Sequence, residues 1–477
     1  MEQSSTPLFD QLTRHHERKP ISFHVPGHKF GEVFSEKGNS FFADILKLDA
    51  TEIAGLDDLH SPEGVILEAE KLLADLYRTK KSFFLINGST VGNLAMIMST
   101  IKEDDIVLVQ RNSHKSIMNG IKLAKGKPVF ISPEYHLDYG VAGGVSLDAV
   151  GAAITQYPDA RALILTYPNY YGMTYDLESI IDLAHNHHIP VLVDEAHGVH
   201  FIAGNYFPPS AVELGADIVV QSAHKTLPAM TMGAFLHYQS KLVSHSHLQF
   251  HLQALQSSSP SYPLMASLDL ARSYLGTYNS EDLAYLQKEI EGFSSIVNNI
   301  DTIRVLTNSD PLKISVQAAG SWTGFDLQKR LESEGVFTEL ADPYNVLLVL
   351  PLLKKGMKHR LREAADKIAV VAKEIPKDEK RLEHMLINQK DVSTLAIDYT
   401  QMEQLDTEVV LLEDSPGRII AESIIPYPPG VPLCLPGEAL NKADLETILY
   451  LREKGAKIQG GEYLSAGKIK VFKGWGI

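Results

Sequence analysis

Seven short apolar runs, each followed by a longer stretch with helical periodicity, constrain the fold of this chain more than any other feature. They are rich in β-branched and aromatic residues and occupy positions 82–87 (SFFLIN), 105–110 (DIVLVQ), 128–132 (PVFIS), 161–167 (RALILTY), 190–195 (PVLVDE), 217–222 (DIVVQS) and 233–238 (GAFLHY). Such alternation is typical of a mostly parallel sheet covered by helices on both faces. We therefore predict an α/β fold with a mostly parallel seven-stranded sheet in a large domain.

The pattern changes after about residue 265, which indicates a second domain. Helical patterns over residues 263–278 and 281–300 precede strand-like segments at 303–308, 313–318 and 345–353. Residues 376–390 are rich in charge and are a candidate linking helix. We divide the chain into an N-terminal arm (1–22), a large domain (23–269), a smaller α+β domain (270–375) and a C-terminal domain (376–477).

One helix is well marked ahead of the first strand. Ser61 can cap it, Pro62 suits the first helical position, and the apolar residues of VILEAEKLLADLY (65–77) form a stripe. We predict that this helix begins at Pro62.

Charge and cysteine content argue against several classes of protein. Asp and Glu outnumber Lys and Arg by 59 to 44, and the net charge of -15 argues against a nucleic acid or an anionic membrane as the main partner. Cys434 is the only cysteine, so the sequence offers neither a disulfide framework nor a thiolate metal cluster. The N-terminal residues lack the apolar core of a signal peptide, and we expect a cytoplasmic protein.

Four strand ends carry polar segments, and ligands of parallel α/β sheets gather beyond such ends. The runs at 82–87, 161–167, 190–195 and 217–222 lead into GSTVGN (88–93), PNYYG (168–172), DEAHGVH (194–200) and SAHK (222–225). We expect these four segments to converge on one edge of one sheet.

GSTVGN is a candidate phosphate site. Its hydroxyl residues Ser89 and Thr90 precede an apolar helix, whose free N–H groups attract anions. Ser and Thr in this place are more often simple helix caps, and no G-K-[ST] phosphate loop occurs in the chain.

Lys225 and Asp194 are charged residues at the ends of apolar strands. A lysine there loses hydration unless it reaches solvent, but a covalent bond to an aldehyde would remove that cost. Asp194 is either a turn residue or the ionised partner of a cation such as a protonated pyridine nitrogen. Ser222 and His224 flank Lys225 and can bind a phosphate together with the hydroxyls of GSTVGN. A phosphate, a pyridinium and an aldehyde together describe pyridoxal 5'-phosphate (PLP).

Histidines supply one further candidate. His114 follows the run at 105–110 and is placed to stack its ring on the cofactor, although a surface or helix-capping histidine fits the same spacing. His247 and His251 are helically spaced but lack a third ligand in the sequence, and we expect no metal site.

Eight segments of the chain resemble the Orn/Lys/Arg decarboxylase family of fold-type I PLP enzymes, in particular its short bacterial members. They are FHVPGHKFG (23–31), LDDLHSPEG (56–64), FFLINGSTVGN (83–93), RNSHKSIM (111–118), VLVDEAHGVH (191–200), SAHK (222–225), SSSPSYPLMASLD (257–269) and PYPPGVPLCLPGE (426–438). FHVPGHK begins at residue 23, and we therefore expect the chain to lack the family's receiver-like N-terminal domain. The resemblance implies a fold-type I PLP-dependent transferase-like fold with a C-terminal decarboxylase domain.

The resemblance also implies a role for each candidate residue. Lys225 would be the Schiff-base lysine, Asp194 the partner of the ring nitrogen, and His114 the stacking ring. The remaining cofactor contacts would come from Ser89, Thr90, Ser222 and His224 at the phosphate, Ala196 on the opposite ring face, His197 near the 3-hydroxyl, and Ser258 or Ser259 at the phosphate of a neighbouring subunit. His224 is also a catalytic candidate. The family more often has a hydroxyl residue where Ala223 stands, which bears on substrate preference.

The implied reaction is the decarboxylation of a basic L-amino acid (arginine, lysine or ornithine) to an amine, as in polyamine biosynthesis. The cationic tail of such a substrate needs carboxylates near the mouth of the site, and the candidates are Glu195, Asp57, Asp58 and Glu422. The alternatives are another fold-type I activity, such as an aminotransferase or an acyl-CoA-condensing synthase, and a non-catalytic PLP-binding protein. We expect a homodimer or a dimer of dimers with shared active sites, and neither nucleic acid nor membrane as a partner.

Overall fold

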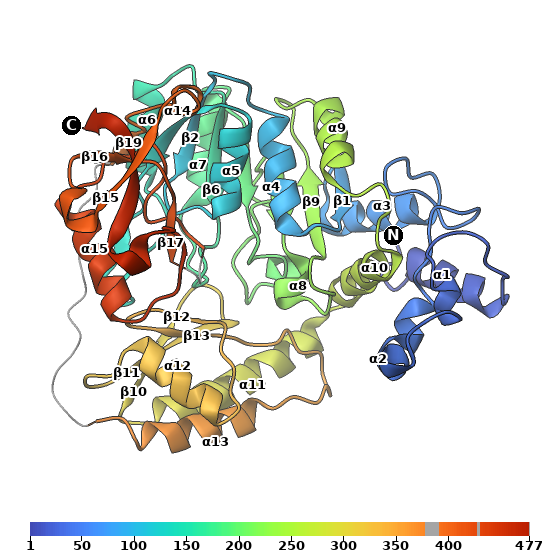
Figure 1. Ribbon diagram of the computed structural model, residues 1–477. Coiled ribbons are helices and arrows are strands. Elements are labelled where there is room, and N and C mark those ends of the chain that lie inside the picture. The colour runs from blue at the N-terminus through green and yellow to red at the C-terminus, as the bar shows by residue number, and fades with distance from the viewer. Residues whose placement is uncertain (377–390, 427–429, 477) are drawn as a thin grey trace. The chain divides into compact units, whose positions relative to one another are not determined.

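The computed structural model describes residues 1–376, 391–426 and 430–476 and has an α/β fold with a large, mostly parallel sheet (Figure 1). By its internal contacts the chain separates into two compact units. Unit 1 comprises Met1–Thr100 and Pro190–Ser280, and unit 2 comprises Ile101–Ile189 and Glu281–Ile477. None of the described helices is both long enough and apolar enough to cross a membrane.

Unit 1 contains four strands of the large sheet: β1 (Lys81–Leu85), β7 (Val191–Asp194), β8 (Ile218–Gln221) and β9 (Ala234–Tyr238). Their order is β1-β9-β8-β7. β7 and β8 are parallel, whereas β9 runs antiparallel to both β8 and β1. The strands β1, β7 and β8 therefore end at the same edge, which is the geometry that the polar strand ends require.

The helices of unit 1 include one that packs closely against this sheet. In α4, a Cβ atom on Gly92 would lie 2.7 Å from Leu85 Cδ1 and 2.8 Å from Val220 Cγ1, so any larger residue would force these side chains to shift. The helices are α1 (Pro7–Glu17), α2 (Glu36–Leu46), α3 (Val65–Tyr77), α4 (Gly88–Met98), α8 (Ala223–Thr226), α9 (His245–Leu255) and α10 (Tyr262–Gly276), with 3-10 turns at Lys29–Gly31 and Phe201–Ala203.

Helix α3 begins at Val65 and not at Pro62, so our prediction of its start was wrong. The Asp57 carboxylate caps the N-terminus of α3, which we had predicted for Ser61. It accepts hydrogen bonds from five backbone N–H groups, which belong to Asp58, Glu63, Gly64, Ile66 and Leu67. Burial would raise the pKa of Asp57, but these N–H groups hold it below its ordinary value.

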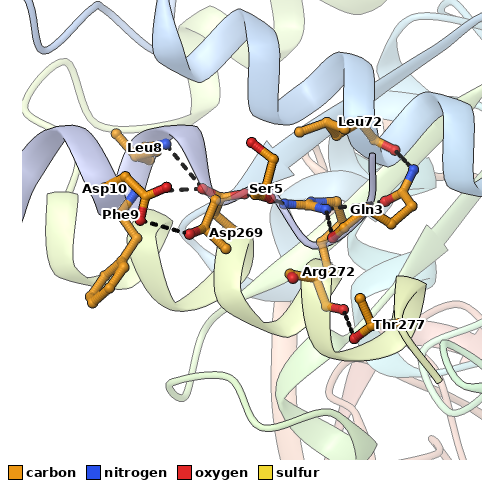
Figure 2. Close-up of polar contacts among 11 residues, drawn as sticks. Gln3, Ser5, Leu8, Phe9, Asp10, Leu72, Asp269, Arg272 and Thr277 are labelled. Carbon is orange, nitrogen blue, oxygen red and sulfur yellow. Dashed lines mark hydrogen bonds and ion pairs between the residues drawn. The ribbon is translucent and has the colours of Figure 1, made fainter. Parts of the chain in front are cut away.

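Arg272 and Asp269 of α10 form a fully buried ion pair, and both side chains hold the N-terminal segment by hydrogen bonds to its backbone (Figure 2). Arg272 Nη2 donates to Asp269 Oδ1 at 2.8 Å, and its guanidinium also donates to the carbonyl oxygens of Gln3 and Ser5. Asp269 Oδ2 accepts the backbone N–H of Leu8 at 3.0 Å. A buried charge pair needs such additional bonds to offset its lost hydration, and here the N-terminal backbone supplies them.

Unit 2 contains β2 (Ile106–Gln110), β3 (Lys127–Ile131), β6 (Ala162–Thr166) and β14 (Val392–Thr394), in the order β6-β2-β3-β14. The first three are parallel, and β14 is antiparallel to β3. All seven apolar runs of the sequence are thus strands of the large sheet. β14 is an eighth strand that the sequence did not predict, because VST is too short to show a period.

The small antiparallel sheet of unit 2, β10-β11-β13-β12, follows the change of pattern that we predicted after about residue 265. Its strands are β10 (Ile303–Thr307), β11 (Lys313–Ala318), β12 (Leu340–Ala341) and β13 (Val346–Val349), with helices α11 (Ser280–Asn298), α12 (Gly324–Ser333) and α13 (Leu361–Ala372). The other helices and short strands of unit 2 before β14 are α5 (Lys115–Leu123), α6 (Leu147–Gln156), α7 (Leu177–Asn186), β4 (Tyr135–His136) and β5 (Val141–Ala142).

The C-terminal residues of unit 2 have a core of their own, in which the side chains of Ile420, Ile424, Cys434 and Ile448 pack together. The elements around it are α14 (Tyr399–Met402), β15 (Thr407–Leu411), β16 (Arg418–Ile420), β17 (Ile424–Pro426), α15 (Lys442–Glu453), β18 (Ile458–Gly460) and β19 (Lys468–Gly476). The predicted linking helix falls almost entirely on residues 377–390, outside the described part of the chain. The boundaries between the four predicted parts of the chain stay predictions.

Candidate active site

Two of the predicted phosphate ligands meet at the sheet edge of unit 1. Ser222 follows β8, Ser89 lies in the first turn of α4, and Ser222 Oγ donates to Ser89 Oγ at 2.9 Å. The turn that leads into α4 depends on Gly88, whose φ of +73° is a left-handed conformation that suits glycine. Thr90 is the next residue of α4 and is exposed. This edge therefore offers hydroxyl groups at the N-terminus of an eleven-residue helix, which favours an anion.

Asp194 ends β7 and is 3% exposed. Its Oδ2 accepts from Asn93 Nδ2 at 2.9 Å, and its Oδ1 accepts from the backbone N–H of Ala196 at 3.2 Å. Both donors are neutral, and among the described residues no Lys, Arg or His lies within ion-pair distance of Asp194. A buried carboxylate held in this way favours a cationic partner. We did not predict Asn93, although an amide on the buried side of an apolar helix was a signal in GSTVGN.

Lys225 lies in the short helix α8, and its side chain is half-buried. Its Nζ lies 3.0 Å from Nε2 of His197, a histidine that is 5% exposed. One nitrogen of this pair must donate and the other accept, so the two groups can share a proton. The structure thus brings Lys225 and His197 together.

The neighbours of Lys225 have different surroundings. His224 Nδ1 lies 3.0 Å from the carbonyl oxygen of Gly233, so this ring nitrogen carries the proton and donates. Ala223 is fully buried, and a hydroxyl in its place would need a hydrogen-bond partner inside the protein. Ala196 is also buried, two positions after Asp194.

Glu195 is not at the mouth of a site, and that prediction was wrong. It is fully buried and accepts from Gln221 Nε2 at 2.6 Å, from Ser210 Oγ at 2.7 Å and from the backbone N–H of Ala211 at 2.7 Å. Burial raises its pKa to about 8, against the effect of these hydrogen bonds. Gln221 Oε1 in turn accepts from His237 Nε2 at 3.0 Å, so the bonds continue across the sheet to β9.

The other predicted substrate carboxylates have mostly structural partners. Asp57 is occupied by the backbone at the start of α3, as described above. Glu422, in unit 2, accepts the backbone N–H groups of Glu462 and Lys470 at 3.0 Å and 2.8 Å. Asp58 accepts the N–H of His60 at 2.8 Å, and its role toward a substrate stays a prediction.

The remaining candidates lie elsewhere in the two units. His114 belongs to unit 2, where it caps α5 and its Nδ1 accepts the N–H of Ser116 at 3.2 Å. Ser258 and Ser259 lie in the exposed segment between α9 and α10 of unit 1. His251 Nδ1 donates to the carbonyl of His247 at 2.9 Å. In the described ranges no group of three or more His, Cys, Asp or Glu side chains is arranged to hold a metal ion.

The residues at the sheet edge of unit 1 fit PLP in their chemistry. Asp194 offers a buried carboxylate for a ring cation, Lys225 offers an amine for an aldehyde, and Ser89 and Ser222 offer hydroxyls for a phosphate. These are the three functional groups by which PLP is usually held. When bound, PLP supplies an electron sink for the electron pair left on the substrate Cα after a bond to that carbon breaks.

Comparison with known proteins gives the family. The model "Orn/Lys/Arg decarboxylase, major domain" matches residues 6–326, and the model of the C-terminal domain of the same family matches residues 381–459. The chain is 43% identical to the Bacillus subtilis protein named "Uncharacterized protein YaaO", over 98% of both chains. It is 36% identical to an arginine decarboxylase of Bacillus subtilis over 99% of both chains.

Solved structures show the same fold. The constitutive lysine decarboxylase of E. coli superposes with a TM-score of 0.80 at 19% identity, over 98% of this chain and 82% of that one. A serine palmitoyltransferase of S. paucimobilis with a bound PLP adduct superposes with a TM-score of 0.52 at 16% identity, over 64% of this chain and 76% of that one. The chain therefore belongs to the Orn/Lys/Arg decarboxylase family and is a PLP-dependent amino-acid decarboxylase.

Proposed function

We propose that this protein decarboxylates a basic L-amino acid, with arginine as the first candidate, and that its site is the sheet edge built from Lys225, Asp194 and their neighbours. We choose arginine because the chain is 36% identical to an arginine decarboxylase over 99% of both chains. The named lysine decarboxylase of E. coli is 23% identical over 96% of this chain, which supports arginine over lysine.

In the proposed site each residue has a task in holding PLP. Lys225 would hold the aldehyde carbon of PLP, Asp194 the ring nitrogen, and His114 one face of the ring. Ser89, Thr90, Ser222 and His224 would hold the phosphate, with Ala196 and His197 beside the ring. Asn93 keeps the Asp194 carboxylate in place through the bond at 2.9 Å.

Proton transfer is the step for which this chain offers the clearest geometry. Lys225 Nζ and His197 Nε2 are 3.0 Å apart, so a proton given up by the lysine can be replaced from the imidazole. We propose this pair as the source of the proton that the product carbon takes up. Asp194 takes no part in this transfer, because its carboxylate is assigned to the ring nitrogen.

We further propose that the protein is a homodimer with shared sites. Phe23 of unit 1 is 95% exposed, Ile21 and Val25 on either side of it in the sequence are 84% and 66% exposed, and Phe41 is 81% exposed. Exposed apolar side chains of this size favour burial against another subunit. The exposed loop that carries Ser258 is a candidate contribution to a neighbouring site. Light scattering of the protein as it elutes from a size-exclusion column measures its molar mass. A monomeric mass would contradict the proposed dimer.

A product screen tests the proposed reaction. The holoprotein is incubated with arginine, lysine or ornithine, and CO2 and amines are measured. We expect CO2 and the arginine-derived amine in equal amounts, with lower turnover of the other two. Transfer of amino groups to a keto acid without CO2 would instead indicate an aminotransferase, and release of neither product by the wild type would indicate a non-catalytic PLP-binding protein.

A further inference from the structure

His114 lies in a short loop between β2 and α5 in which the neighbouring residues are fixed. Asn112 Oδ1 accepts from Gln110 Nε2 at 2.8 Å, and its Nδ2 donates to the carbonyl oxygen of Gly143 at 3.0 Å. Ser113 Oγ accepts from Thr166 Oγ1 at 3.1 Å. His114 Nδ1 itself lies 2.8 Å from Ser116 Oγ in α5, so the placement of the ring follows that of α5 and of the two loop ends, Arg111 and Lys115.

Arg111 is held by the segment 430–438 of the C-terminal residues. Its Nε and Nη2 donate to the two carboxylate oxygens of Glu438 at 2.9 Å and 2.8 Å. Its Nη1 and Nη2 also donate to the carbonyl oxygens of Pro432 and Leu433 at 2.8 Å and 3.0 Å. Arg111 is 8% exposed and the Glu438 side chain is 21% exposed, so these four bonds are largely shielded from water. A largely shielded two-pronged contact of this kind fixes both position and orientation.

Lys115 is held by the same segment. It is the first residue of α5, and its backbone N–H, which has no partner within the helix, donates to the carbonyl oxygen of Gly430 at 3.2 Å. His114 thus stands between two residues that are both bonded to the segment 430–438, which is more than 300 positions further along the chain.

The segment 430–438 is itself well anchored. The N–H of Leu433 donates to the carbonyl of Ile424 in β17 at 2.8 Å, and that of Gly437 donates to the carbonyl of Ile420 in β16 at 2.8 Å. Cys434 is 2% exposed and belongs to the C-terminal hydrophobic core. Contacts therefore run without a break from that core to Arg111 and Lys115.

We propose that the segment 430–438 is a positioning element for His114, and that Arg111 and Glu438 are positioning residues for the cofactor-stacking ring. The C-terminal residues would then contribute to cofactor binding without touching the cofactor. This inference rests on the proposed function, in which His114 stacks on PLP.

Arg111→Lys is the first test, because lysine keeps the charge but cannot form the two-pronged contact. We expect PLP to bind the apoprotein about tenfold more weakly, the loss that corresponds to one charge-assisted hydrogen bond. We also expect the visible circular dichroism of bound PLP to change, because it reports how the ring is held. The KM for the amino acid should stay near the wild-type value when PLP is saturating.

The chain offers a matched control in Arg330→Lys. Arg330 makes the same two-pronged contact with Glu374, at 2.9 Å and 2.5 Å, but on the exposed surface of unit 2. This variant should bind PLP like the wild type. If Arg111→Lys does so as well, with unchanged visible circular dichroism, the proposal is wrong.

Two further variants keep the result interpretable. Glu438→Gln retains the shape of the side chain and one acceptor oxygen, and it should also weaken PLP binding. If Arg111→Lys loses its far-ultraviolet circular dichroism and so does not fold, the PLP affinity of Glu438→Gln tests the positioning role instead. Lys225→Ala separates this inference from the proposed function. If Lys225→Ala leaves the visible absorbance of bound PLP unchanged, the proposed site is wrong. If it abolishes that absorbance while neither variant of the Arg111–Glu438 pair alters PLP binding, only the positioning role fails.

Discussion

Replacement of Glu70 by glutamine is expected to stabilise the protein at alkaline pH but not near pH 5. Glu70 lies on α3, is 6% exposed and lines a cavity of about 280 Å³. Its Oε1 accepts the N–H of Phe84 at 3.0 Å. Burial raises the pKa of Glu70 from 4.5 to about 8, although the bond from Phe84 acts in the opposite direction.

The sign of this pH dependence follows from which state, folded or unfolded, binds the Glu70 proton more tightly. The folded protein holds the Glu70 proton up to about pH 8, whereas the unfolded chain releases it near pH 4.5. The free energy of unfolding therefore falls as pH rises from about 4.5 to about 8 and is level above that. At about 1.4 kcal/mol per pKa unit, the shift corresponds to roughly 5 kcal/mol as an upper limit, since entry of water into the cavity beside Glu70 would lower the cost of a buried charge.

Urea unfolding of the holoprotein at a series of pH values from 5 to 9 measures this difference. Glu70→Gln keeps an acceptor oxygen for Phe84, so its midpoint should match the wild type near pH 5, exceed it increasingly up to about pH 8, and exceed it by a constant amount above that. Glu68→Gln, on the exposed face of the same helix, is the control and should follow the wild type throughout. Wild-type and Glu70→Gln midpoints that run parallel over the whole series would refute the reasoning.

Three further substitutions test other parts of the account. Asp194→Asn should lower kcat with arginine by at least about a hundredfold at saturating PLP, because the amide cannot balance a ring cation; near-normal turnover would contradict its role. Asp57→Asn should lower Tm by about 2–4 °C, since a charged acceptor of five backbone N–H groups is lost. Because the folded-state pKa of Asp57 is lowered, this difference should be present above about pH 4 and disappear as pH falls through that folded-state pKa, which a thermal series would detect. Asp269→Ala should cost about 3–5 kcal/mol by leaving Arg272 without its buried partner, and protease should then cleave within the first 20 residues sooner than in the wild type.

The strands could be predicted because each is an apolar run of the right length bounded by turns. The candidate residues at three of their ends could be predicted as well, since parallel strands place these ends together: Ser89 contacts Ser222, and Lys225 contacts His197. The roles of these residues toward PLP stay predictions, because only the cofactor itself would show them.

The errors have specific physical causes. Glu195 follows Asp194 directly, and successive residues of an extended chain point to opposite faces, so the neighbour of a candidate site residue entered a buried network instead. The start of α3 was misplaced because its N–H groups are capped by Asp57, a side chain outside the usual capping position. The contact between Arg111 and Glu438 could not be predicted, since no local pattern links residues so far apart in the chain.

The central claim is that Lys225 anchors PLP in a decarboxylase site, and chemical reduction of the holoprotein tests it most directly. Borohydride fixes PLP to the lysine that holds it, and peptide mass spectrometry then locates the modified residue. We predict that the modification is on Lys225, in the peptide that contains SAHKT, and that reduction abolishes release of CO2 from arginine. Modification of a different lysine, or full CO2 release after complete modification of Lys225, would contradict the account.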